Sequence, residues 1–276
     1  MIYFTDKNHE YFNENNDKYI SVSQLVDQYK QPFDTEYWLK YKALERLMPN
    51  FKKIKWKFTS EREAVRLLSL DMESKLFDDT VEKIRNEWNG SKNVSIVKGN
   101  NYHKDAEKMS FIRKVMDNPF TKTKFKVIKL DKVDGYANNS VKNLYELEDG
   151  FYPELVLWND KYKLAGQSDK VFISTEKNIR YIDIDDYKTN KKIDTTGFKG
   201  QKMLYPISHI DDCNYNQYAL KISAYAWMLE DFGFQVRNLG FHHYNLLYKT
   251  PYLKAEIESL LKIRKAKLDI NNSNLL

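Results

Sequence analysis

The residues best suited to chemistry lie in the segment 181–189, which reads YIDIDDYKT. Asp186 and Lys188 stand two residues apart at the end of an apolar, β-branched run, and a further acid, Asp169, lies upstream. Because side chains alternate between the two faces of a strand, Asp186 and Lys188 are expected to share one face. This pairing suits metal-assisted phosphodiester hydrolysis, in which acids hold a divalent cation and a lysine steadies the attacking water or the charge on phosphorus.

Asp169 lies in the apolar stretch LAGQSDKVFI, three residues after Gly166. Taken alone, this pattern favours a hairpin in which the acid caps a turn or forms a salt bridge at a strand edge. Together with Asp186 and Lys188 it favours a metal ligand, since an unpaired carboxylate is costly inside an apolar strand and a cation supplies the partner. Lys188 has a plain alternative of its own, an exposed lysine at a strand end.

His103 and Glu107 are four residues apart on a helix expected from about residue 101 to 117. Side chains at this spacing lie on the same face of a helix. A lone histidine at a helix start is more often structural. A neutral imidazole can nevertheless join two carboxylates around a cation, with a main-chain carbonyl or water completing the shell. His103 is therefore the predicted third metal ligand. Glu107 is predicted to lie behind the ligands and to hold them in place without binding the metal itself.

Gln217, Lys221 and Tyr225 recur every four residues in a helix expected over residues 215–231, so they share one face. One interpretation is an ordinary amphipathic helix that packs on a sheet. The other is a polar stripe of amide, amine and phenol that points to a metal centre and positions a backbone phosphate. The sequence leaves both open.

The composition narrows the class of protein. The chain has 276 residues, of which 42% are hydrophobic and 14% aromatic, enough for a packed core. Its net charge of +6 suits a polyanionic partner. A single cysteine, Cys213, excludes an internal disulfide framework and a four-cysteine zinc or iron–sulfur site, and a GxxxxGK[ST] phosphate loop is absent. With no signal peptide and no apolar run of membrane-spanning length, the expected location is the cytoplasm and no membrane partner is expected.

Hydrophobic periodicity, together with the positions of capping and turn residues, predicts the helices and strands that must position these residues. A helical region begins after Ser60 and is predicted to end at Gly90. The later elements alternate, which predicts an α/β or α+β fold with a mixed sheet flanked by helices. A helical N-terminal subdomain is expected at residues 1–92 and a core at 93–276. The later expected elements are strands at 145–158, 162–173, 179–187 and 236–247, and helices at 215–231 and 253–268.

The ordered set of motifs is much rarer than any one of them. It consists of Gly-x3-His-x3-Glu ending at Glu107, Gly-x2-Asp ending at Asp169, Asp-Tyr-Lys-Thr at 186–189, and a helix that carries Tyr225. With this set, the chain resembles the PD-(D/E)XK nuclease superfamily, specifically RecB-type nuclease domains and phage-type recombination exonucleases. The similarity covers about residues 80–250 in motif order.

The resemblance implies a restriction-endonuclease-like core and a Mg²⁺ centre that also accepts Mn²⁺. It implies that His103, Asp169, Asp186 and the Tyr187 carbonyl hold the metal and that Lys188 is the catalytic lysine. The implied activity is cleavage of DNA phosphodiester bonds, primarily as an exonuclease, in phage or mobile-element replication and recombination inside a bacterial host. A replication or recombination protein is the implied partner.

One position departs from the family pattern. Relatives carry glutamine four residues before the tyrosine of the last motif, where this chain has Lys221. Either Gln217, one turn earlier, replaces this glutamine, or Lys221 itself takes over the contact with the phosphate. The departure motivates an alternative function, a catalytically impaired DNA-binding module on a nuclease scaffold. A nicking or structure-selective endonuclease is a further alternative.

Overall fold

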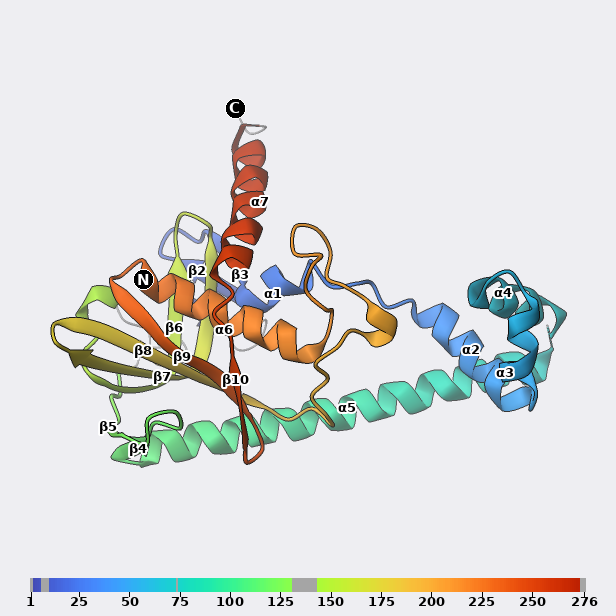
Figure 1. The fold of residues 1–276 in the computed structure, drawn as a ribbon, viewed down its shortest axis with the longest axis horizontal. Helices are drawn as coiled ribbons and strands as arrows, with labels where there is room; N and C mark the ends of the chain where they lie inside the picture. The colour runs from blue at the N-terminus through green and yellow to red at the C-terminus, as the bar shows by residue number, and fades with distance from the viewer. Residues whose placement is uncertain (1, 6–9, 73, 131–142, 274–276) are drawn as a thin grey trace. The chain divides into compact units, whose positions relative to one another are not determined.

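The computed structural model describes residues 2–5, 10–72, 74–130 and 143–273. Its contacts divide the chain into two compact units, whose elements are labelled in Figure 1. We call Met1–Gln31 with Asn101–Leu276 the sheet unit and Pro32–Asn100 the helical unit. These boundaries differ from the expected division at residues 92 and 93, because the N-terminal strands join the sheet through parallel pairing of Ile20 with Leu164.

The sheet unit is built on an eight-stranded mixed sheet. The strand order is β1-β2-β3-β7-β8-β9-β10, with β6 paired to β7. The β3–β7 and β8–β9 pairs are parallel and the others are antiparallel. The strands are β1 (Ile2–Thr5), β2 (Glu10–Asn13), β3 (Lys18–Ser21), β6 (Gly150–Asn159), β7 (Leu164–Glu176), β8 (Ile179–Lys188), β9 (Phe234–His243) and β10 (Leu246–Thr250), and a separate hairpin joins β4 (Val115–Asp117) to β5 (Lys124–Lys126).

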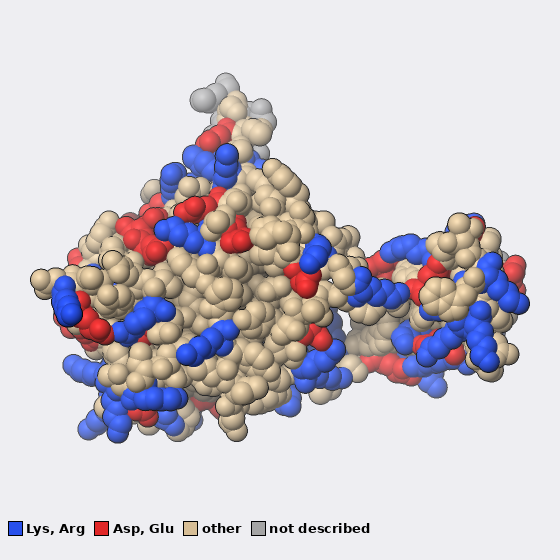
Figure 2. All heavy atoms as spheres, in the orientation of Figure 1, with Lys and Arg blue, Asp and Glu red and all other residues tan. Residues whose placement is uncertain are grey.

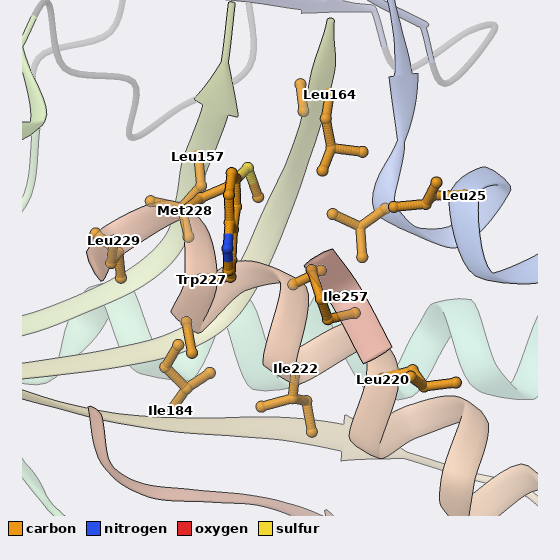
Figure 3. Close-up of a cluster of buried hydrophobic side chains, with 14 of the residues drawn as sticks. Leu25, Leu157, Leu164, Ile184, Leu220, Ile222, Trp227, Met228, Leu229 and Ile257 are labelled. Atoms are coloured by element: carbon orange, nitrogen blue, oxygen red, sulfur yellow. The ribbon is translucent and has the colours of Figure 1, made fainter. Parts of the chain in front are cut away.

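Helices flank this sheet, and Figure 1 shows α6 running across it. Ile184 of β8 lies among apolar side chains that include Ile222 and Met228 of α6 (Figure 3), and all three are fully buried. Burying one such side chain stabilises a fold by about 1.5–3 kcal/mol. The prediction of a mixed α/β fold with flanking helices is therefore confirmed. The helices and 3₁₀ turns of this unit are α1 (Val22–Asp27), η2 (Leu144–Glu146), η3 (Phe198–Gly200), α6 (Asn214–Glu230), α7 (Lys254–Ser273) and the last part of α5 (Lys75–Ile112).

The helical unit has a core of its own, formed by Leu39, Leu44, Phe51, Val65 and Ile84 among other buried apolar side chains. The predicted start after Ser60 is confirmed, because the Ser60 hydroxyl accepts a hydrogen bond from the Glu63 N–H and caps the helix. The elements of this unit are α2 (Thr35–Leu47), α3 (Phe51–Ile54), η1 (Lys55–Lys57), α4 (Glu61–Asp71) and the first part of α5.

Several expected boundaries were wrong. Gly90 does not end a helix, because α5 continues through it to Ile112 and includes residues 101–112 of the segment expected to form a separate helix. The end of that expected helix, at residues 115–117, is instead the strand β4. A glycine inside a helix costs only about 1 kcal/mol relative to alanine, which the surrounding helix tolerates. The expected strand at 236–247 is a hairpin of β9 and β10, whose turn holds Tyr244 at a φ of 55°.

The acids of β8 alternate between faces, as the sequence predicts. Asp183 is fully buried on the face opposite Ile184, where it accepts hydrogen bonds from Arg237, Asn118 and Asn238, each at 2.7 Å. Asp185 lies on the same side as Asp183 and accepts a hydrogen bond of 2.6 Å from Lys170. Each of these two acids is paired with a basic side chain of the sheet.

No helix in the described ranges combines the length and apolar character that crossing a bilayer requires.

Candidate active site

The sheet opens at one point along β7, and the candidate site lies there. Pairing between β7 and β8 ends at Lys170 and Asp185, while Asp186 to Lys188 remain paired with β9. On the same edge of β7, β3 pairs only with residues 164 and 165. Asp169 therefore lies where the edge of β7 lacks a neighbouring strand. Its Oδ2 instead accepts a hydrogen bond of 2.7 Å from the Tyr187 N–H.

Asp169 and Asp186 come together across this opening. Burial raises the pKa of Asp169 well above its ordinary value, and the negative charges of Asp186 and Glu154 raise it further. Burial also disfavours the charged form of Asp186, but the Lys188 ammonium and a hydrogen bond from Asp169 outweigh it and lower its pKa to about 2. Without a cation, the two carboxyl groups are thus too close for both to ionise readily, and the pair shares a proton.

Glu154 is the third acid of the site, and the sequence reasoning missed it. The β6–β7 register passes from Pro153–Lys170 to Leu155–Ser168, so Glu154 is unpaired opposite Asp169. Its backbone has a φ of 52°, a left-handed conformation that is strained for a residue with a side chain. Burial raises its pKa to about 8, helped by the charges of Glu107 and Asp186. The available signal was an acid inside the apolar strand sequence GFYPELVLW.

Lys188 supplies the ammonium that the sequence predicts beside Asp186. Its Nζ contacts the Asp186 carboxylate and donates to the Tyr187 carbonyl oxygen at 3.1 Å. Burial opposes the charged form, but the charges of Asp186 and Asp169 raise the pKa of Lys188 above its ordinary value. The ring of Tyr218 lies 5.0 Å from this Nζ and is a further neighbour that the sequence did not indicate.

The last part of α5 brings His103 to the same acids. Its Nδ1 lies 3.6 Å from Asp169 Oδ2. Burial lowers the pKa of His103, despite the opposing charge of Asp186, so the imidazole is held in the neutral form that can bind a metal. Glu107, one turn later, acts electrostatically on Glu154. Both helix residues that the sequence singled out therefore reach the site.

The three candidate residues of α6 have different partners. Tyr225 packs over Gly166, where a Cβ would lie only 2.7 Å from the tyrosine ring, and burial with the nearby acids raises its pKa well above its ordinary value. Lys221 Nζ lies 3.8 Å from an Asp27 carboxylate oxygen, and burial lowers its pKa. Gln217 donates a hydrogen bond of 2.8 Å to Asp212. Tyr225 thus faces the acids, while the Gln217 amide is used elsewhere.

The donor set fits a hard divalent cation in chemical type and in charge. Three acids, Glu154, Asp169 and Asp186, interact electrostatically with each other, and Lys188 is the ammonium that contacts Asp186. When all three acids are ionised, the site carries excess negative charge in a buried place, which carboxylate-binding Mg²⁺ or Mn²⁺ would offset. Among the described residues, however, no three His, Cys, Asp or Glu side chains are already gathered into a metal-binding group. Side-chain movement would have to complete the shell.

The raised pKa of Glu154 predicts a pH-dependent stability without metal. Between its ordinary value of 4.5 and about 8, the folded protein holds a proton that the unfolded chain releases. The free energy of unfolding should therefore fall as pH rises through this window, by on the order of 1 kcal/mol per pH unit for this one group. Urea unfolding in EDTA at pH 5, 6.5 and 8 measures the slope. Asp169 acts in the same direction, so Glu154→Gln should reduce the slope without abolishing it, and equal slopes would contradict the prediction.

Comparison with known proteins adds no assignment: no protein-family model, curated protein or solved structure matches this chain. A functional proposal for this chain therefore depends on the geometry of the site and on the order of the motifs along the sequence.

Proposed function

We propose that this protein is a metal-dependent DNA nuclease with a PD-(D/E)XK-type core, acting mainly as an exonuclease. The observation that carries the proposal is the convergence of Asp169, Asp186 and Lys188 where β8 separates from β7. Asp169 of one strand meets Asp186 and Lys188 of the next strand at one buried point, where acids outnumber ammonium groups. Structural ion pairs elsewhere in the sheet, such as Lys170 with Asp185, match one cation to one acid.

Each residue has a role in this proposal. Asp169, Asp186, His103 and the Tyr187 carbonyl would hold Mg²⁺ or Mn²⁺, and Glu154 joins them as an acid that sequence reasoning did not include. When bound, the cation would acidify a water molecule and polarise the phosphate. Lys188, held between Asp186 and the Tyr187 carbonyl, would orient the nucleophile or stabilise negative charge that develops on the phosphate oxygens.

The substrate side of the site would be formed by α6. Tyr225 interacts electrostatically with the acids, and Lys221 is a half-buried lysine whose ammonium would contact a phosphate of the DNA backbone. Lys221 would then serve where relatives in the resembled superfamily use glutamine. The net charge of +6 supports a polyanionic substrate. The proposed setting is phage or mobile-element replication or recombination in the bacterial cytoplasm, with a protein partner from that process.

A time course on end-labelled linear DNA and covalently closed circular DNA tests the proposal. Purified protein should degrade the linear substrate with Mg²⁺ or Mn²⁺ and leave it intact in EDTA. An exonuclease cannot start on a closed circle, so nicking or cutting of the circle would assign endonuclease action instead. DNA binding without any product under either metal would refute the nuclease and leave a DNA-binding module on a nuclease scaffold.

A further inference from the structure

A short basic segment of the helical unit has no place in the proposed active site. Residues 52–57 read KKIKWK, with four lysines and no acid. They form the end of α3 and the turn η1. Trp56 lies in this turn with 79% of its surface exposed, although large aromatic side chains are usually buried. Lys and Arg side chains are prominent on the surface of the helical unit in Figure 2.

The four lysines fall into two classes. Lys52 forms an ion pair of 2.9 Å with Glu45, and Lys55 forms one with Glu61. Lys53 and Lys57 are exposed, and neither forms an ion pair within the described part of the chain. Two positive charges beside the exposed indole are therefore not offset by an ion pair with any residue that the structure describes.

Lys55 links the exposed tryptophan to the folded unit. Its Nζ lies 5.3 Å from the centre of the Trp56 ring and 5.0 Å from the centre of the Tyr41 ring, and it donates a hydrogen bond to the Tyr41 hydroxyl. Tyr41 belongs to the core of the helical unit. The indole is thus held by a cation–π contact while most of its surface remains open to a ligand.

We propose that this segment is a second nucleic-acid contact, in which Trp56 stacks on an unpaired base while Lys53 and Lys57 bind the flanking phosphates. An aromatic ring between lysines is the combination that binds single-stranded nucleic acid without reading its sequence. The choice of partner rests on the proposed nuclease function, because DNA with unpaired ends is the expected substrate. An anionic membrane fits less well, since interfacial binding needs a broad apolar face and Trp56 is the exposed large apolar side chain of this segment.

Fluorescence anisotropy of a labelled single-stranded oligonucleotide, titrated with the full chain in EDTA, tests the proposal. Trp56→Ala should weaken binding about 10-fold, whereas Trp56→Phe should keep most of the affinity because the ring persists. Phe33→Ala, at an aromatic residue of the same unit that is 66% exposed, is the matched control and should change little.

The lysines are tested by salt dependence. Lys53→Gln with Lys57→Gln removes two phosphate contacts, so the slope of log K against log salt should become shallower by about 1.4. Lys262→Gln with Lys267→Gln, at two exposed lysines of α7, removes the same charge elsewhere and should leave the slope nearly unchanged.

Affinity that is unchanged in Trp56→Ala, or no binding at all in EDTA, would overturn the proposal. Binding to vesicles containing anionic lipid that depends on Trp56, without binding to the oligonucleotide, would also overturn it and assign a membrane surface. Because no cleavage occurs in EDTA, this test is separate from the nuclease assay. A protein that binds through Trp56 but never cleaves DNA would refute the nuclease and keep the contact.

Discussion

Replacing Asp186 with asparagine should reduce Mg²⁺-dependent DNA cleavage by on the order of 10³-fold or more, a loss comparable to that from removing an essential charged catalytic group. The protein should stay folded. Burial, the main cause of the raised pKa of Asp169, remains in Asp186→Asn, but the repulsion from Asp186 is removed, so Asp169 ionises more readily and can take over as the partner of Lys188. Initial rates on linear DNA and thermal unfolding, measured on the same preparation, test both parts.

Asp183→Asn is the matched control for this prediction. It makes the same chemical change in the same strand, but Asp183 lies on the opposite face and is bonded to Arg237. Breaking a buried pair costs about 3–5 kcal/mol, so this variant should lose stability and keep its activity per folded molecule. Full activity in Asp186→Asn, or equal loss of activity in both variants, would refute the assignment of the active site.

Replacing Lys188 with methionine should separate catalysis from cation binding. The methionine side chain keeps the length of the aliphatic stem but removes the charge, and the loss of one preorganised electrostatic contact should lower kcat by about 10²–10³-fold. Cation binding should not fall with it. Asp186 loses its ammonium partner, so no positive charge competes with the cation for the acids and the affinity for Mg²⁺ should be equal or higher.

Isothermal titration calorimetry with Mg²⁺ distinguishes the two variants. Asp186→Asn should lose both cation affinity and cleavage, whereas Lys188→Met should lose cleavage alone. Lys188→Arg keeps the positive charge with a different shape and should recover part of the rate. If Lys188→Met cleaves DNA at the wild-type rate, the lysine has no part in the reaction and is a structural partner of Asp186.

Local patterning was enough to predict much of this protein. The alternation in YIDIDDYKT placed Asp186 on the face opposite Asp183, because side-chain direction in a strand depends only on position along the chain. The helix that carries Tyr225 and the mixed α/β class also followed from periodicity. His103 and Glu107 lie one turn apart on a single helix, as their spacing predicts. Each of these features depends on residues that are close in sequence, or on the pattern of apolar residues that become buried.

Contacts between distant segments decided the rest. Glu154 enters the site because the β6–β7 register places it opposite Asp169, where β8 separates from β7, and no local pattern encodes how three strands register against one another. The same reason explains why Gln217 bonds Asp212 while Tyr225 reaches the acids, although the two share a helical repeat. The sequence thus determined which side chains could do chemistry and which face each occupies. Only the tertiary structure decided which of them meet, because pairing register and burial are properties of the whole sheet.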